Sequence, residues 1–143
     1  MVRPIKITHI NSEWDRCDIY YEEVNHYTKL YGVLNEFYVY KNDSRYATML
    51  KDSTKEEKIK LYNIVFSDIK DYMESNNVDY LFFNIKEQIP FEKRMKQYIS
   101  YFNDYSFYTN YKIDADITDV YMVRNTIKHK FEDLNNYVQY KFE

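Results

Sequence analysis

The chain has 143 residues, a length that predicts one domain over residues 1–143. Its 20 lysines and arginines against 23 aspartates and glutamates give a formal net charge of −3, which neither demands a polyanionic partner nor resembles an acidic mimic of DNA. No run approaches the ~18 apolar residues of a membrane span, no charged-then-apolar leader opens the chain, and the single Cys17 cannot form an internal disulfide. We therefore expect a cytoplasmic protein without a membrane partner.

The chain has a single glycine, Gly32, where average usage of about 7% would supply about ten. Sites that close backbone amides on a phosphate use several glycines, because glycine tolerates positive φ angles and close approach. This excludes P-loops and dinucleotide-binding fingerprints. The 18 tyrosines and 9 phenylalanines favour strands and a large buried area. We expect most tyrosines in the core or on strand faces and a few available for recognition.

The first third of the chain predicts an antiparallel meander of short strands. A nearly alternating apolar segment behind Pro4 indicates the first of them, with Ile5, Ile7 and Ile10. Three further strands are expected over Cys17–Val24, Tyr27–Leu34 and Glu36–Tyr40. Asn25-His26 is the expected turn between the first two of these, since asparagine accepts left-handed backbone angles, and a second turn is expected near Asn35.

A long helix is the clearest predicted element. Ser53 and Thr54, each followed three residues later by glutamate, are overlapping capping-box candidates. Apolar residues recur behind them at helical spacing until Asn76-Asn77, where the helix is expected to end. The near-continuous apolar run Val78–Ile85 is then typical of a strand buried on both faces.

The last third predicts two more helices and two strands. Pro90 suits the first turn of a helix that ends at Asn103-Asp104. The remaining expected elements are strands Ser106–Ile113 and Val120–Arg124, the solvated acidic loop Asp114–Asp119 between them, and a terminal helix over Thr126–Tyr140. This order indicates an α/β (α+β) fold, with a mixed, mainly antiparallel sheet flanked by about three helices.

Three short motifs follow one another between Leu61 and Ile113. They are the helical Val65-Phe66-Ser67-Asp68-Ile69, the strand Asp79-Tyr80-Leu81-Phe82-Phe83 and the helical Arg94-Met95-Lys96-Gln97-Tyr98. Together with the order of elements, they resemble a group of bacteriophage-encoded proteins with the GNAT (Gcn5-related N-acetyltransferase) fold. The resemblance implies that Tyr98 stands where these enzymes keep a tyrosine that protonates the departing thiolate of coenzyme A. Tyr98 equally continues the apolar stripe of its own helix.

The resemblance also implies an acetyl-CoA pyrophosphate loop of the type R/Q-x-x-G-x-G/A before the long helix. Here Arg45–Thr54 contains no glycine, and Asp52 adds negative charge where the phosphate would lie. Four residues are left as candidates to contact a phosphate: Lys51, Ser53, Thr54 and Lys55. Helix capping and a solvated lysine explain them as well.

Other chemistries find less support. Asp114–Asp119 lacks the sixth-position glycine and the terminal glutamate of a calcium loop. The three histidines and Cys17 lie far apart without ligand spacing, so we expect no metal site, and an inert strand cysteine. The basic residues of the terminal segment are offset by Glu132 and Asp133, so nucleic acid is not the expected partner.

We expect a non-enzymatic phage or mobile-element accessory protein that binds another protein on a GNAT-like scaffold, with no cofactor. Its partner would be a virion protein or a host defence component, so that the protein acts as a virion component or as an inhibitor of host defence; a homo-oligomer stays open. Surplus tyrosine suits a contact surface, because it buries much area at small entropic cost. The alternative is an active N-acyltransferase that uses acetyl-CoA with a degenerate loop and Tyr98 as general acid.

Overall fold

A computed structural model describes residues 1–7, 10–26, 29–45, 53–86, 90–127 and 132–141. The strands are β1 (Val2–Lys6), β2 (Arg16–His26), β3 (Lys29–Lys41), β4 (Ser44–Arg45), β5 (Tyr80–Lys86), β6 (Tyr105–Lys112), β7 (Ile117–Arg124) and β8 (Val138–Gln139). The α-helices of this described part are α1 (Lys55–Ser75) and α2 (Phe91–Tyr101), and the 3-10 turns are η1 (Ile113–Ala115) and η2 (Glu132–Asn136).

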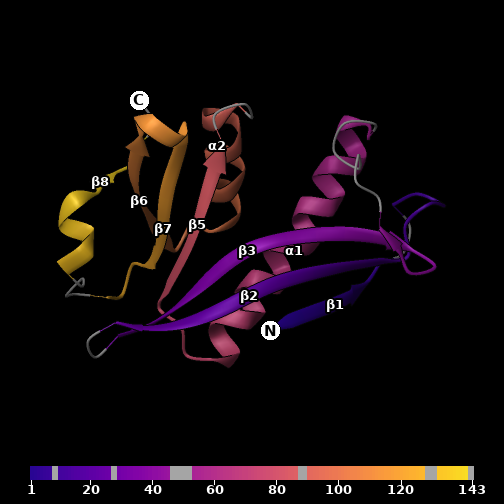
Figure 1. The fold of residues 1–143 in the computed structure, drawn as a ribbon, viewed down its shortest axis with the longest axis horizontal. Helices are drawn as coiled ribbons and strands as arrows, with labels where there is room; N and C mark the ends of the chain where they lie inside the picture. Colours follow the sequence, from indigo (N-terminus) through magenta and orange to yellow (C-terminus); the bar gives the residue numbers. More distant parts are fainter. Residues whose placement is uncertain (8–9, 27–28, 46–52, 87–89, 128–131, 142–143) are drawn as a thin grey trace. The chain divides into compact units, whose positions relative to one another are not determined.

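The strands form one mostly antiparallel sheet in the order β1-β2-β3-β5-β7-β6-β8, whose members are labelled in Figure 1. Strand β4 pairs with β3 outside this order. The expected class, an α+β fold with a mixed and mainly antiparallel sheet, is confirmed. Two α-helices stand in the described residues where about three were expected.

The chain divides into two compact units. Unit 1 comprises Met1–Glu22 and Leu34–Tyr72, and unit 2 comprises Glu23–Val33 and Met73–Glu143. Strands β2 and β3 and helix α1 contribute residues to both. The single domain expected over residues 1–143 stays a prediction.

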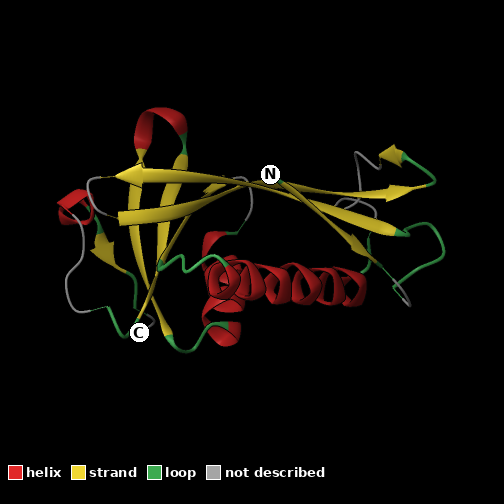
Figure 2. Ribbon diagram, turned by 90° about the horizontal axis from the view of Figure 1, so that it is seen from below, coloured by secondary structure: helices red, strands yellow, loops and turns green. Residues whose placement is uncertain are grey.

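In unit 1, the strands bury one face of the sheet against α1, which lies beneath them in Figure 2. Odd-numbered side chains of β2, Cys17, Ile19 and Tyr21, are almost fully buried, as a strand with one covered face requires. The Tyr21 ring stacks on Tyr72 of α1, with centroids 4.1 Å apart. Phe37 of β3 likewise lies edge-on to a tyrosine of α1, at 5.6 Å.

The predicted meander is corrected in two places. Strand β3 runs continuously through Asn35, and Asn25-His26 belong to β2, so neither is a turn; residues 27–28 lie outside the described residues. Along β3 the buried positions change from even-numbered, at Leu34, to odd-numbered, at Val39. Side chains of a strand alternate between its two faces with a period of two. The change of parity within β3 therefore looks, in the sequence, like a break between two strands.

Positive φ angles fall on asparagine and aspartate. Among the described residues they occur at Asn42, Asp43, Asn77 and Asp116, with φ between 50° and 67°. Asn42-Asp43 forms the two-residue turn that joins β3 to β4, closed by the pair Lys41↔Ser44, as expected for a turn with two left-handed residues. The chain thus makes its tight turns here without glycine.

Both ends of α1 are capped as the sequence predicts. The Thr54 hydroxyl accepts a hydrogen bond from the backbone N–H of Glu57 at 3.1 Å, which is the N-cap half of a capping box. At the other end, Asn77 takes a left-handed conformation and the N–H of Val78 donates to the carbonyl of Met73 at 3.0 Å. This closes the helix with a Schellman-type bond.

Replacing Thr54 with alanine is expected to lower the free energy of unfolding by about 1 kcal/mol, because the Glu57 N–H loses its acceptor. Thr54→Ser keeps the oxygen and serves as the control. Urea denaturation of the two variants checks the difference; equal midpoints would contradict the capping role.

In unit 2, β5 is the central strand. It pairs in parallel with β3 over Tyr31–Val33 and antiparallel with β7 over its whole length. Tyr80, Leu81 and Phe83 are buried, as predicted for a strand covered on both faces. Helix α2 begins after Pro90 and ends before Asn103-Asp104, as predicted.

The predicted terminal helix over Thr126–Tyr140 is wrong in its described part. Leu134 is buried on a 3-10 turn against Tyr80 and Tyr121. The chain then extends as β8 beside β6, and the N–H of Tyr140 donates to the carbonyl of Phe107 at 2.7 Å. Residues 128–131 lie outside the described residues. Asn135-Asn136 have weak helix propensity, so packing and strand pairing decide the conformation.

The predicted acidic loop is shorter than expected. Asp114 and Asp116 are exposed, as expected, but β7 already begins at Ile117. Asp119 is therefore a strand residue, only 6% exposed. Its carboxylate pairs with the Lys112 ammonium at 2.8 Å, which compensates the burial of the charge.

Candidate functional site

Three of the four residues predicted to contact acetyl-CoA lie at the start of α1. Ser53 is half-buried, Thr54 and Lys55 are exposed, and Lys51 lies outside the described residues. Ser53, Thr54 and Lys55 are neighbours because they are consecutive in the chain. The Thr54 hydroxyl accepts the N-cap hydrogen bond of α1. The capping interpretation therefore accounts for Thr54 without a phosphate.

Tyr98, the predicted general acid, belongs to unit 2 and is 4% exposed. Its ring stacks on Phe83 of β5, with centroids 4.5 Å apart and planes 16° from parallel. Phe107 of β6 meets the same ring edge-on at 6.4 Å. Tyr98 thus lies in the aromatic core between α2 and the sheet, where the apolar stripe of its helix also placed it.

Cys17 is fully buried on β2. Burial first, and then the charges of Asp18 and Asp68, raise the pKa of its thiol to about 12. Since the thiolate is the reactive form, Cys17 is protonated and unreactive at neutral pH.

Ellman's reagent is expected to leave Cys17 unmodified in the native protein at about pH 8 and to react at once in denaturant. The folded chain favours the thiol, because its pKa is about 12 against the ordinary 9.0. The stability this contributes is complete below about pH 9 and is lost as the pH rises toward 12. Cys17→Ala should unfold with a weaker dependence on pH in that window. Rapid modification of the native thiol would contradict the burial.

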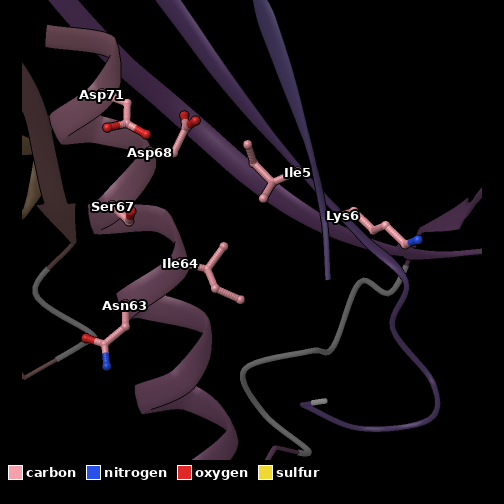
Figure 3. A pocket seen from close by; sticks show the side chains of 7 residues that line it. All are labelled: Ile5, Lys6, Asn63, Ile64, Ser67, Asp68 and Asp71. Carbon is pink, nitrogen blue, oxygen red and sulfur yellow. The ribbon is translucent and has the colours of Figure 1, made fainter. Parts of the chain in front are cut away.

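A pocket of about 510 Å³ lies between β1 and α1 (Figure 3). It is lined by Ile5, Lys6, Asn63, Ile64, Ser67, Asp68 and Asp71. Figure 3 shows Asp68 pointing from the helix toward the strands. Its carboxylate accepts hydrogen bonds from Arg3 Nε at 3.0 Å and from the Tyr21 hydroxyl at 2.9 Å. The buried acid of this pocket therefore ties β1 and β2 to α1.

Aromatic and basic side chains gather on the opposite face of the unit 1 sheet. Because odd-numbered residues of β2 and the second half of β3 face α1, the even-numbered ones face away from it. The tyrosine face is our name for Arg16, Tyr20, Glu36, Tyr38 and Tyr40, together with Arg45 of β4, which lies opposite Tyr40 in the β3–β4 register. All six side chains are partly or fully exposed.

The rings of the tyrosine face contact one another and two guanidinium groups. Tyr20 and Tyr38 meet edge to face at 5.9 Å. Arg16 lies 4.4 Å above the centroid of Tyr40, and Arg45 lies 4.4 Å above that of Tyr38. Cation–π contacts of this length hold both partners in place.

Hydrogen bonds fix the same side chains further. The Tyr38 hydroxyl donates to Glu36, and this bond raises the pKa of Tyr38. A hydrogen bond with Tyr40 raises the pKa of Tyr20. Arg16 donates to Asp18 and Asp43, each at 2.9 Å, and its bond to Asp43 is the main reason why its pKa is raised. The phenols of Tyr20 and Tyr38 are therefore neutral at physiological pH.

The tyrosine face is not evident as a surface from the sequence. Tyr38 and Tyr40 alternate with the buried Val39, which is the signal of a strand with one exposed face. The strand that carries them was predicted over Glu36–Tyr40 and lies within β3, but the face that it exposes was not. Composition alone could not separate these rings from the other tyrosines.

In the described part of the chain, no three His, Cys, Asp or Glu side chains gather closely enough to hold a metal ion. The helices of that part do not include one with the length and hydrophobicity of a membrane span. Comparisons with protein-family models, with curated proteins and with solved structures find no match to this chain.

Proposed function

We propose that this protein is a non-enzymatic binding protein that contacts another protein through the tyrosine face. The observation that carries the proposal is the chain of contacts from Arg16 through Tyr40, Tyr20 and Tyr38 to Arg45 on an exposed sheet face. Tyrosine and arginine are enriched in protein interfaces and at their energetic centres. Because contacts within the face already hold these side chains in place, they lose little conformational entropy when a partner binds.

The proposal includes a GNAT-like scaffold in a phage or mobile-element accessory protein. Its support is the succession of α1, a strand parallel to β3, α2 and an antiparallel strand pair, together with the resemblance over Leu61–Ile113. The partner is then a virion protein or a host defence component, met in the host cytoplasm or in the virion.

Binding is favoured over acyl transfer by two contacts. Thr54 is engaged in capping α1, and Tyr98 is stacked between aromatic side chains with 4% of its surface exposed. A general acid must come within hydrogen-bond reach of its leaving group, which the enclosed Tyr98 ring does not offer in this conformation.

Millimolar acetyl-CoA is expected to leave the melting temperature unchanged. A ligand present at 100 times its Kd would stabilise the native state by about 2.7 kcal/mol, which raises the melting temperature of a chain of this size by roughly 5–10 °C. Differential scanning fluorimetry with acetyl-CoA, and with ATP as a control for nucleotide binding, measures the shift. A rise with acetyl-CoA alone would restore the acyltransferase.

Affinity capture from the native host tests the binding role. The bait is the tagged chain, a Tyr20→Ser/Tyr38→Ser/Tyr40→Ser variant, and a matched control with Ile59→Ser, Asn63→Ser and Lys70→Ser on the exposed side of α1. Circular dichroism melts verify that the variants fold. We expect one abundant protein with the wild type and the control and its loss with the tyrosine variant. Equal capture by all three, or no capture, would count against the proposal.

A further inference from the structure

We infer that the partner surface presents a carboxylate, which pairs with Arg45, beside apolar side chains, which pack on Tyr20, Tyr38 and Val2. This rests on the proposed function and adds the chemistry of the partner to it.

The two arginines of the tyrosine face differ in their ion pairs. Each lies 4.4 Å above a tyrosine ring, but Arg16 has two carboxylate partners, Asp18 and Asp43, at 2.9 Å. Arg45 has no carboxylate partner among the residues that the structure describes, and its side chain is exposed. A guanidinium stacked on a ring keeps its in-plane N–H donors available, and their fork matches a carboxylate.

The charge around Arg45 favours a single anionic group over a polyphosphate. On this face and its margins, the basic Arg16 and Arg45 stand among the acidic Asp18, Glu22, Glu36 and Asp43. A nucleic acid needs several cations along its backbone. Among the described residues of this face, Arg45 is the guanidinium without a carboxylate partner, and acidic side chains outnumber basic ones.

Apolar surface continues from the rings onto β1. Val2 lies directly opposite Tyr20 in the β1–β2 register and is 46% exposed, and Pro4 lies opposite Asp18. Apolar side chains of a partner therefore meet Val2, Tyr20 and Tyr38 next to the position of Arg45. This mixture of an apolar centre and a charged margin is typical of protein interfaces.

Binding by addition of a strand to β1 is disfavoured. Reciprocal hydrogen bonds join Met1 to Tyr21, and the N–H of Ile7 donates to Asp15. The backbone N–H and C=O groups of odd-numbered residues of β1 thus point toward β2, and the backbone of the even-numbered Pro4 points toward the outer edge of the sheet. Because proline has no N–H, it interrupts the row of donors that an added strand needs. The partner is therefore expected to bind the tyrosine face, where side-chain contacts determine which partner fits.

The test is a selection from a library of random peptides displayed on particles. The targets are the wild type, Arg45→Glu, Arg45→Gln and the tyrosine-face variant, each first checked by its melting temperature. Wild type should select peptides with aspartate or glutamate beside apolar residues. Their affinity should fall about ten- to a hundredfold on Arg45→Glu and be lost on the tyrosine variant. Arg45→Glu should itself select lysine or arginine.

Each other outcome overturns the inference. Peptides that bind the tyrosine face without acidic residues, or that bind Arg45→Glu as tightly as wild type, would show that the partner needs no carboxylate. The proposed function would remain intact. Peptides insensitive to the tyrosine substitutions, or no selected peptides, would remove the inference. The proposed function is tested separately by capture from the host, where equal capture by all three baits or no capture would count against it. A fluorescent oligothymidine that binds wild type but not Arg45→Glu would replace the protein partner with a nucleic acid.

Discussion

Asp68→Ala is expected to lower the free energy of unfolding by about 3 kcal/mol. The Asp68 carboxylate is 5% exposed and joins three elements through Arg3 and the Tyr21 hydroxyl. Removing one partner of a buried ion pair costs about 3–5 kcal/mol. The lower value applies because the Arg3 side chain is 29% exposed and can turn to water.

Urea denaturation followed by circular dichroism measures this loss. Asp71→Ala is the matched control, since Asp71 lies one turn further along α1, lines the same pocket and is exposed. Its effect should stay within about 0.5 kcal/mol. Equal losses in the two variants would show that the Asp68 contacts do not stabilise unit 1.

Tyr98→Ala is expected to cost about 3–5 kcal/mol, the loss typical of a large aromatic side chain removed from a core. The ring lies against Phe83, Phe102 and Phe107, so its removal leaves a cavity that stacked neighbours cannot easily fill. Tyr98→Phe keeps the ring and should lose no more than about 1 kcal/mol.

Tyr101→Ala, on the same helix and 37% exposed, provides the control and should cost less than about 1 kcal/mol. Chemical denaturation of the three variants gives the ranking. The phenylalanine variant also separates the two roles of Tyr98. A chain that transfers acetyl groups and loses that activity in Tyr98→Phe, with its stability unchanged, would make the hydroxyl catalytic.

The elements that the sequence predicted well carry their own boundary signals. Helix α1 begins at a capping threonine and ends at an asparagine that accepts a left-handed backbone, and α2 begins after a proline. Strand β5 is marked by a continuous apolar run that is too short for a typical helix. Local chemistry is enough in these places.

The errors lie where distant contacts decide. The segment around Leu134 has apolar residues at helical spacing, yet it packs as a 3-10 turn because β6 accepts the following residues as a strand. Asp119 was expected in a solvated loop, but its ion pair with Lys112 lets it lie in β7. No property of either residue alone signals its partner.

The sequence predicts a tyrosine-rich contact surface but does not predict which tyrosines form it. A surplus of tyrosine indicates a contact surface, but the choice of Tyr20, Tyr38 and Tyr40 depends on which parity of β2 and β3 faces α1. That parity follows from the packing of Tyr21 on Tyr72, a contact between residues far apart in sequence.

Pro4 has a consequence for the behaviour of the protein in concentrated solution. Long strands rich in tyrosine and poor in glycine and proline are the kind of segment that stacks into fibrils when an open edge is available. With its missing donor at the centre of the end strand β1, this edge does not present a continuous row of donors to a copy of the chain. Pro4 thus protects this edge of the sheet against strand pairing between copies of the chain.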